Sequence, residues 1–374
     1  MPRVLILTAS VGEGHDLPAR TLAAQLASES PDAEIVTEDG LVPMGRFVTA
    51  ISADSGRIVF FRLQWLWDVG FWFFARARPT RLFTQTVLTR LGSKGLLRLI
   101  DRVDPDVIVS TYPNTTEVLG RLRARGRIGV PVCSAITDLS ALRYWAGPGV
   151  DLHLIAYPQS LDEVRAIAGP ASRVLAVHGL TSPAFLDQRD QGEARRDLQL
   201  PLEGGIALVS GGGWGVGDIE GAVEAALTLS EIACLVCLCG RNARLQQQLV
   251  SRFERDPRVR IEGFTDRMAD WMAAADVLVH STGGLTVLEA LMCGLPAISY
   301  GWGRGHLRPN NAAFARTGLA QVVPDRAALP PALVRALTQG RTPTDAYRHL
   351  PSAASLVLDA ANNSKRWQAS VDAY

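Results

Sequence analysis

The residues from 280 to 296 combine the groups that a phosphate-binding helix needs. A predicted buried strand leads into Gly283 and Gly284, and a helix with apolar periodicity follows. A helix whose first turn is bare backbone presents N–H groups and the positive end of its dipole, so it can hold a phosphate. Thr286 adds a hydroxyl in that turn, and Glu289 is placed to accept hydrogen bonds from a ribose diol. The alternative is an ordinary tight turn between strand and helix.

A second group of glycines lies in the run Ser-Gly-Gly-Gly-Trp-Gly-Val-Gly at 210–217, again between a predicted strand and a predicted helix. Glycine lets a backbone approach an anion closely and adopts positive φ without strain. We therefore expect Ser210, Gly212 and Gly213 to contact a ligand. The alternative is a flexible hinge, but the position directly after a strand favours a ligand contact.

Two further loops could contact the base of a nucleotide. Arg241 and Asn242 follow one predicted strand, and Phe264 lies in the run Gly-Phe-Thr-Asp-Arg-Met at 263–268. An aromatic side chain in a loop can stack on a base, and backbone groups beside it can read the edge of that base. Either loop could equally contribute to the core.

A candidate general base lies in the loop Ser-Val-Gly-Glu-Gly-His-Asp at 10–16, between the first predicted strand and a predicted helix. The loop is not a dinucleotide-binding fingerprint, because Leu17 stands where that motif requires a small residue. His15 lies at a helix N-terminus, and an imidazole suits the removal of a proton from a hydroxyl group. The helix dipole disfavours the imidazolium there, which keeps the base form available. The alternative is a capping or surface histidine.

The composition describes a globular protein with two domains. The 374 residues are 47% hydrophobic and 20% charged, and the formal net charge of +1 gives no general attraction to nucleic acid. Cys237 and Cys239 would lie on one face of a predicted strand and Cys234 on the other, so these three thiols cannot converge on a metal. We expect them to be core residues in a reducing compartment.

Short apolar runs alternate with helical patterns, which predicts an α/β fold with parallel sheets buried on both faces. The runs fall on either side of a polar stretch at 187–205. We therefore expect two doubly wound, Rossmann-like domains facing a cleft, at 1–190 and 200–345, and a tail at 346–374 that returns to the first domain. The predicted strands are Val4–Leu7, Val107–Val109, Val132–Ile136, Leu152–Ala156, Ile206–Val209, Leu235–Leu238, Val277–Val279 and Ala297–Ser299.

The segment 57–81 is rich in aromatic and arginine residues, and eight of its residues are Phe or Trp. Its charged and polar residues argue against a membrane span, whereas aromatics beside arginines suit the surface of an anionic bilayer or a lipid ligand. The alternative is a buried pair of helices. The residues that we expect to contact the acceptor or the membrane are Arg62, Trp65, Trp67, Phe71, Trp72 and Arg76.

Five motifs occur in a characteristic order: GEGH at 12–15, SGGGWG at 210–215, CGRN at 239–242, GFTDRM at 263–268 and STGGLTVLEA at 281–290. This order resembles that of glycosyltransferases with the GT-B fold. Within them, the chain resembles most the group that contains monogalactosyldiacylglycerol synthases, processive diacylglycerol glucosyltransferases and MurG. Thr137-Asp138 followed by Trp145, and the run GLTSPAF at 179–185, resemble the lipid-modifying branch.

The resemblance implies roles for individual residues. It makes His15 or Asp138 the base toward an acceptor hydroxyl, lets Phe264 and Met268 cover a uracil, and lets Glu289 bind the ribose. The family often has Gln and Glu where this chain has His306 and Leu307, so the identity of the sugar stays open. The other residues expected to contact the sugar donor are Gly14, Ser210, Gly212, Gly213, Arg241, Asn242, Ser281, Gly283, Gly284, Thr286, His306 and Asn310.

The activity implied is inverting transfer of a hexosyl or N-acetylhexosaminyl group from a UDP-sugar to a hydroxyl of a lipid or lipid-linked acceptor. Asp104-Pro-Asp106 fits the DxD pattern of metal-dependent enzymes, but it precedes a predicted strand at the wrong end of the sheet, so a turn is the better interpretation. We expect no metal and no cofactor beyond the UDP-sugar, which is a substrate. A leaving diphosphate would then be stabilised by helix N-termini and backbone N–H groups.

The expected partners are a UDP-sugar, a hydrophobic acceptor and an anionic membrane surface, without nucleic acid. The expected location is cytoplasmic, attached to the inner face of the membrane. Two alternatives stay open. A UDP-N-acetylglucosamine 2-epimerase on the same fold would need no acceptor, and His306 and Leu307 leave room for a nucleotide-sugar-binding protein without catalysis.

Overall fold

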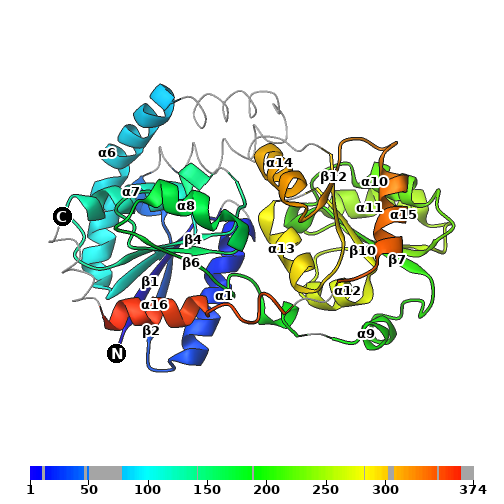
Figure 1. Ribbon diagram of the computed structural model, residues 1–374, viewed down its shortest axis with the longest axis horizontal. Coiled ribbons are helices and arrows are strands. Elements are labelled where there is room, and N and C mark those ends of the chain that lie inside the picture. Colours follow the sequence, from blue (N-terminus) through cyan, green and yellow to red (C-terminus); the bar gives the residue numbers. More distant parts are fainter. Residues whose placement is uncertain are drawn as a thin grey trace. The chain divides into compact units, whose positions relative to one another are not determined.

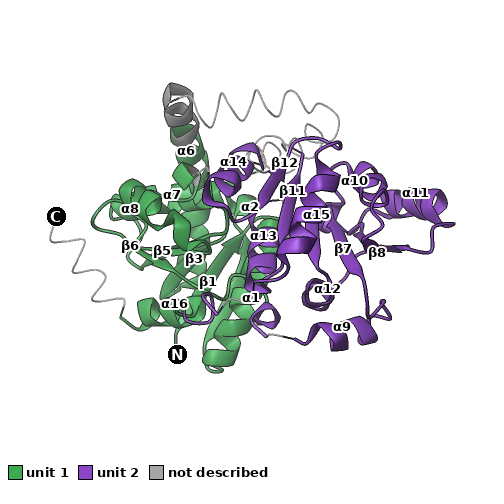
Figure 2. Ribbon diagram, turned by 45° about the vertical axis from the view of Figure 1, so that its right-hand side comes forward, with its two compact units in different colours: residues 1–182, 350–374 green, residues 183–349 purple. Residues whose placement is uncertain are grey.

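The computed structural model divides the chain into two compact units, shown in different colours in Figure 2. Unit 1 comprises Met1–Ser182 and Leu350–Tyr374, and unit 2 comprises Pro183–His349. In the part of the chain that the structure describes, each unit has one parallel sheet of six strands with helices packed against it, as Figure 1 shows. The predicted α/β fold class is therefore confirmed. The structure describes residues 1–10, 13–45, 49, 78–140, 142–187, 189–281, 283–301, 307–342 and 345–363.

In unit 1 the strands lie in the order β2-β1-β3-β4-β5-β6, and every neighbouring pair is parallel. The strands are β1 (Arg3–Thr8), β2 (Glu34–Asp39), β3 (Val107–Ser110), β4 (Val132–Ile136), β5 (Leu152–Ile155) and β6 (Arg173–Ala176). The helices are α1 (Glu13–Glu29), α2 (Leu41–Met44), α6 (Arg78–Val103), α7 (Pro113–Ala124), α8 (Leu161–Ala168) and α16 (Ala353–Asn362), and the 3-10 turns are η3 (Leu142–Tyr144) and η4 (Pro158–Ser160).

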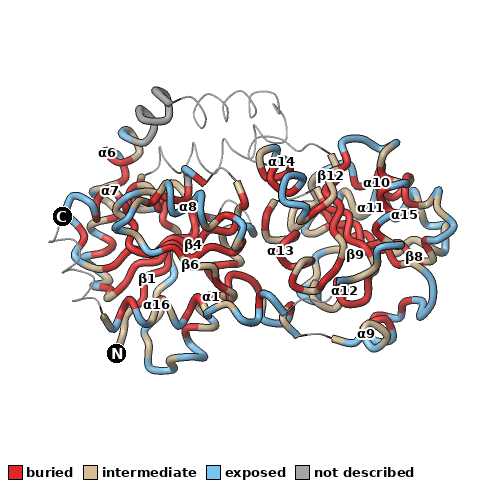
Figure 3. The backbone as a smooth tube through the Cα atoms, in the orientation of Figure 1, coloured by how far each residue is buried: buried red, intermediate tan, exposed pale blue. Residues whose placement is uncertain are grey.

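The central strands of unit 1 are buried on both faces, which explains their unbroken apolar sequence. Leu5, Leu7 and Ile108 pack with α6 and α7 in one core cluster, while the alternating residues Val4 and Ile6 are equally buried on the opposite face. Figure 3 shows these strands as continuous buried segments. The sheet is therefore a rigid platform for the loops at its carboxyl edge.

The last described helix, α16, packs against α1, the first helix of the same unit. The backbone of His178 bonds on both sides of Ser352: its N–H donates to the Pro351 carbonyl and its carbonyl accepts from the Ala353 N–H. The Ser352 hydroxyl donates to the Glu29 carboxylate at 2.6 Å. These bonds fix the start of α16 beside the end of α1.

In unit 2 the strands lie in the order β12-β11-β10-β7-β8-β9, again all parallel. The strands are β7 (Gly205–Ser210), β8 (Ile232–Leu238), β9 (Val259–Glu262), β10 (Val277–His280), β11 (Ala297–Tyr300) and β12 (Gln321–Val323). The helices are α9 (Gln191–Asp197), α10 (Ile219–Ala226), α11 (Ala243–Phe253), α12 (Met268–Ala274), α13 (Gly284–Met292), α14 (Leu307–Thr317) and α15 (Leu329–Gln339), and the 3-10 turns are η5 (Pro183–Phe185) and η6 (Gly212–Trp214).

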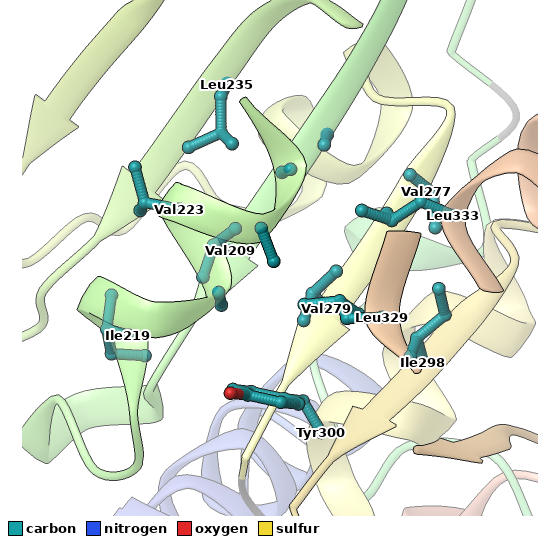
Figure 4. Packing of buried hydrophobic residues seen from close by; sticks show 14 of the residues in the cluster. Val209, Ile219, Val223, Leu235, Val277, Val279, Ile298, Tyr300, Leu329 and Leu333 are labelled. Atoms are coloured by element: carbon teal, nitrogen blue, oxygen red, sulfur yellow. The ribbon is translucent and has the colours of Figure 1, made fainter. Parts of the chain in front are cut away.

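The core of unit 2 is the cluster drawn in Figure 4, in which strand residues pack against α10 and α15. Val209, Val279 and Ile298 come from three neighbouring strands, and Leu329 and Leu333 come from α15. On the other side of the sheet α12 contacts β7, and α13 contacts β11. Helices therefore cover both faces, as in unit 1.

Both sheets reverse their strand order at one point, and this reversal decides where ligands can bind. In unit 1 the chain passes from β1 to β2 on one side and then to β3 on the other, and in unit 2 β8 and β10 flank β7 in the same way. The loops that leave the carboxyl ends of the two central strands diverge there and open a crevice. His15 follows β1 and the glycine run 210–217 follows β7, so the candidate residues lie at these switch points.

Several expectations fall outside the part of the chain that the structure describes. Residues 57–77, which include the six expected acceptor or membrane contacts, are among them, and so is His306. In the described ranges, no helix has both the length and the apolar character needed to cross a bilayer.

Candidate active site

In unit 1 the candidate base His15 is held by the loop that follows β3. Its Nδ1 atom lies 3.1 Å from the carbonyl oxygen of Thr111, and the Thr111 hydroxyl donates to the carbonyl oxygen of His15 at 3.0 Å. A carbonyl oxygen can only accept, so Nδ1 carries the proton and the lone pair of the neutral ring lies on Nε2. Two reciprocal bonds thus fix both the position and the tautomer that a general base requires.

Two aromatic rings enclose the imidazole. Tyr112 meets His15 edge to face, with centroids 4.9 Å apart, and Trp145 lies tilted at 5.5 Å. Trp145 is almost fully buried, and its Nε1–H donates to Oδ2 of Asp138 at 3.1 Å. Trp145 is therefore in contact with both candidate bases, His15 and Asp138.

The sequence builds this arrangement with short local signals. Pro113 starts α7 directly after Tyr112, and the Thr116 hydroxyl donates to the Tyr112 carbonyl within the first turn. Gly14, before His15, is exposed, and a Cβ placed there would meet nothing within 4 Å, so packing does not require this glycine. Its missing side chain keeps the space beside His15 open.

In unit 2 the structure distinguishes the three helices that follow β7, β8 and β10. Asp218 caps α10 by accepting from the Gly221 N–H at 2.9 Å, and Asn242 caps α11 by accepting from the Leu245 N–H at 3.0 Å. The N-cap residue of α13 is Gly283, which has no side chain. Of the three, α13 is therefore the helix whose N-cap residue places no side chain between an anionic ligand and the positive end of the helix dipole.

The glycine run after β7 is held in place by protein contacts. Gly217 has φ of 101°, and a Cβ there would lie 2.4 Å from the Cβ of Ser281. The carbonyl of Gly213 accepts from the Arg241 N–H at 2.8 Å, and the Ser210 hydroxyl accepts from the Gly212 N–H at 3.2 Å. The described residues thus form a preformed loop, which argues against the hinge interpretation.

A hydrogen bond between Tyr300 and Asp218, which we call the clamp, joins the end of this loop to the end of β11. The Tyr300 hydroxyl donates to Oδ2 of Asp218 at 2.8 Å, while the other oxygen of the same carboxylate caps α10. Figure 4 shows Tyr300 at the end of the core cluster that includes Ile219, the first residue of α10. Burial, followed by the Asp218 carboxylate, raises the pKa of Tyr300, so the phenol stays protonated and keeps donating.

The remaining residues expected to contact the sugar donor lie around the same edge of the second sheet. Glu289 in α13 is 6% exposed, and Ser281 and Thr286 are partly buried on either side of the Gly283 cap. Phe264 follows β9 and is 49% exposed, and Met268 begins α12 and is partly buried. Asn310 lies in α14 and is buried, so its side chain belongs to the interior of unit 2.

Asp104 and Asp106 lie at the opposite, amino end of the first sheet. Oδ2 of Asp106 accepts from the backbone N–H of Arg3 at 2.7 Å, and Asp104 adopts a φ of 50° in the turn before β3. Within the described ranges, no group of His, Cys, Asp or Glu side chains could hold a metal ion. The three cysteines of β8 and its end are buried thiols, and burial raises the pKa of Cys239 to about 11.

Comparisons with known proteins agree with this geometry. Residues 15–180 match the family model for monogalactosyldiacylglycerol (MGDG) synthase, and residues 206–365 match the model for the glycosyltransferase family 28 C-terminal domain. The processive diacylglycerol beta-glucosyltransferase of Staphylococcus epidermidis is 24% identical over 324 residues, which cover 86% of this chain and 81% of that protein. The enzyme with the same name from Staphylococcus saprophyticus is 25% identical over 321 residues, with the same coverage.

Solved structures share the fold. MurG of Acinetobacter baumannii aligns with a TM-score of 0.55 and 16% identity, over 96% of this chain and all of that chain. Os79 from O. sativa, solved in complex with UDP, aligns with a TM-score of 0.58 and 14% identity, over 97% of this chain and all of that chain. At these identities the likeness concerns the fold alone.

Proposed function

Because the chain is a glycosyltransferase of the GT-B fold, with an MGDG synthase domain followed by a family 28 C-terminal domain, we propose that it transfers a hexosyl group from a UDP-sugar to a hydroxyl of diacylglycerol or a related lipid. The observation that carries the proposal is the first turn of α13. Its N-cap residue is Gly283, which has no side chain, and the buried carboxylate of Glu289 lies further along the same helix. A diphosphate and a ribose would meet these two features together.

The reaction would be a single displacement. Nε2 of His15 takes the proton of the acceptor hydroxyl, the acceptor oxygen forms a bond to C1 of the sugar, and the bond from C1 to the diphosphate breaks. The negative charge of the leaving UDP would be stabilised by the backbone N–H groups and the dipole at the start of α13. Attack from the face opposite the leaving group inverts C1, which agrees with the word "beta" in the relatives' name, since UDP-hexoses are α-linked.

The nature of the acceptor follows from the relatives rather than from the described residues. The two family relatives are named for diacylglycerol, and the N-terminal family model is named for a diacylglycerol-modifying synthase. We propose that the aromatic segment 57–81 contacts this lipid, or the anionic membrane surface that holds it. The same names favour glucose or galactose as the sugar.

A binding measurement with a matched control tests the donor. Thermal unfolding would be followed with UDP, UDP-glucose, UDP-galactose, UDP-N-acetylglucosamine, GDP and TDP, for the wild-type protein, Glu289→Gln and the exposed control Glu254→Gln. A ligand at about a hundred times its Kd stabilises a protein by about 2.7 kcal/mol. We expect UDP species alone to stabilise the wild type and the control, and Glu289→Gln to lose most of this effect.

A turnover measurement tests the reaction. The UDP-sugar that binds best would be incubated with diacylglycerol in detergent micelles, and the anomeric configuration of the glycolipid would be read by NMR. A β-linked product supports the proposal. An epimerised sugar nucleotide formed without acceptor, or tight UDP-sugar binding without turnover of any lipid, would refute it.

A further inference from the structure

Arg241 and Phe264 form a pair at the carboxyl edge of the second sheet. The guanidinium carbon of Arg241 lies 3.7 Å from the centroid of the Phe264 ring, which is a cation–π contact. The two residues follow neighbouring strands, because β8 and β9 pair up to Leu238 and Glu262. One face of the Phe264 ring, which we expect to stack on a base, is therefore occupied by the Arg241 guanidinium.

The backbone of Arg241 is fixed, whereas its side chain is exposed. Its N–H donates to the carbonyl of Gly213. The preceding Gly240 has φ of 58°, and a Cβ at this position would lie 2.4 Å from the carbonyl oxygen of Gly212. The guanidinium thus extends on a long flexible stem from a rigid point between the glycine loop and Phe264. Rotation about its side-chain torsions can carry the guanidinium away from Phe264.

A base and a guanidinium cannot occupy the same face of one ring, because the present distance is already van der Waals contact. The observed contact of the guanidinium with Phe264 also differs in strength from a contact that it could make with a phosphate. A cation–π pair at an exposed site is weak, and Phe264 is 49% exposed. A charge-assisted, bidentate bond from a guanidinium to a phosphate is much stronger. A ligand that carries both a base and a phosphate would therefore draw Arg241 away from the ring.

We propose that Arg241 exchanges partners when the sugar donor binds. Without nucleotide it covers Phe264, and with nucleotide its guanidinium moves to the diphosphate while the base stacks on the exposed ring. The proposal rests on the donor site proposed above and adds a specificity to it. A nucleoside without phosphate must displace Arg241 and offers it no anion in return, so the exchange favours nucleoside diphosphates over nucleosides.

The test compares the affinities for uridine, UMP and UDP by isothermal titration calorimetry. The variants are Arg241→Ala, Arg241→Lys and the control Arg244→Ala, which removes an exposed arginine from the first turn of α11. We expect Arg241→Ala to weaken UDP binding by about tenfold to a hundredfold and to leave uridine binding unchanged or tighter. Arg241→Lys should retain part of the UDP affinity, and Arg244→Ala should match the wild type.

Two results would overturn the exchange. An equal loss of uridine and UDP affinity in Arg241→Ala would mean that the guanidinium stays in the base stack, and no loss of either would mean that it takes no part. Thermal unfolding of the variants without ligand would show that the exposed substitutions leave the fold intact. A wild-type protein that binds no uracil nucleotide would instead refute the proposed function, so the two failures are distinguishable.

Discussion

The indole of Trp145 bonds to Asp138 through Nε1 at 3.1 Å while its ring lies 5.5 Å from the imidazole of His15. The same side chain therefore orients a carboxylate and forms part of the wall beside the candidate base. The Ser134 hydroxyl donates to the Trp145 carbonyl at 2.9 Å, which ties the position of the indole to β4. Trp145 is therefore a positioning residue with two functions, the hydrogen bond to Asp138 and the packing beside His15, and substitutions can separate them.

Trp145→Phe removes the N–H donor and keeps an aromatic ring, whereas Trp145→Ala removes both. We expect Trp145→Phe to lower kcat/KM for the acceptor about tenfold to a hundredfold, because a hydrogen bond to a charged group contributes about 1.5–3 kcal/mol. Trp145→Ala should cost more, since the wall beside His15 is lost as well. Steady-state kinetics and UDP titrations would be measured together. A change in UDP affinity equal to the change in kcat/KM would contradict a role confined to the acceptor side.

His15→Ala should lower kcat by about a hundredfold to ten-thousandfold, the usual contribution of a general base. UDP affinity should change little, because all residues expected to contact the sugar donor lie in unit 2 except Gly14. His349→Ala provides the control, since His349 is exposed and lies in unit 2. Single-turnover rates with saturating UDP-sugar would separate chemistry from binding. A His15→Ala enzyme with wild-type turnover would leave Asp138 as the base to test next.

Tyr300→Phe should loosen the glycine loop by breaking the bond to Asp218. We expect a loss of about 1.5–3 kcal/mol in the free energy of unfolding of unit 2, and a higher KM for the sugar donor. Tyr347→Phe is the matched control, because Tyr347 is a buried tyrosine of the same unit with no hydrogen bond to the described residues. Urea unfolding and donor kinetics would both be measured. A stability loss without any change in the donor KM would show that the clamp is structural only.

His153 should make the stability of unit 1 fall in mildly acidic solution. Burial lowers its pKa from 6.5 to about 4, and its Nε2 accepts from the Gly147 N–H. Below pH 6.5 His153 therefore binds a proton in the unfolded chain but not in the folded protein. The free energy of unfolding consequently decreases as the pH falls from 6.5 toward 4. Between about pH 7.5 and about pH 5.5 the wild type should lose about 1 kcal/mol more than His153→Gln.

Urea unfolding at the two pH values checks this difference, and His349→Gln serves as the control because an exposed histidine should leave the wild-type slope unchanged. Parallel slopes for the wild type and His153→Gln would show that folding does not lower the pKa of this imidazole.

The strands that the sequence predicts and those that it misses differ in their place in the sheets. All eight predicted runs are interior strands of the two sheets. The four missed strands, β2, β6, β9 and β12, are the outer ones, and their residues are mostly exposed or partly buried. An outer strand has one neighbour and a solvated face, so charged residues such as Glu34 and Arg260 break the apolar run that marks a buried strand.

The residues of the candidate site also divide into those that the sequence reveals and those that only the fold reveals. A glycine run after a strand can be seen in the sequence, and so can a histidine at the start of a helix. Asn242 and Asp218 are also typical N-cap residues, and the structure shows both of them capping a helix. Thr111 and Tyr112 could not be found in this way, because their contacts with His15 depend on β1 and β3 being neighbours, which periodicity does not reveal.

The pairing of His178 with Ser352 means that unit 2 is an insertion between two adjacent points of unit 1. During synthesis the ribosome must therefore release all of unit 2 before α16 exists. Until then the part of α1 that packs against α16 in the native protein lacks its partner. Unit 2 can therefore complete its core on the nascent chain before unit 1 does. Unit 1 begins first, but its packing is complete only when α16, the last described helix, has left the ribosome.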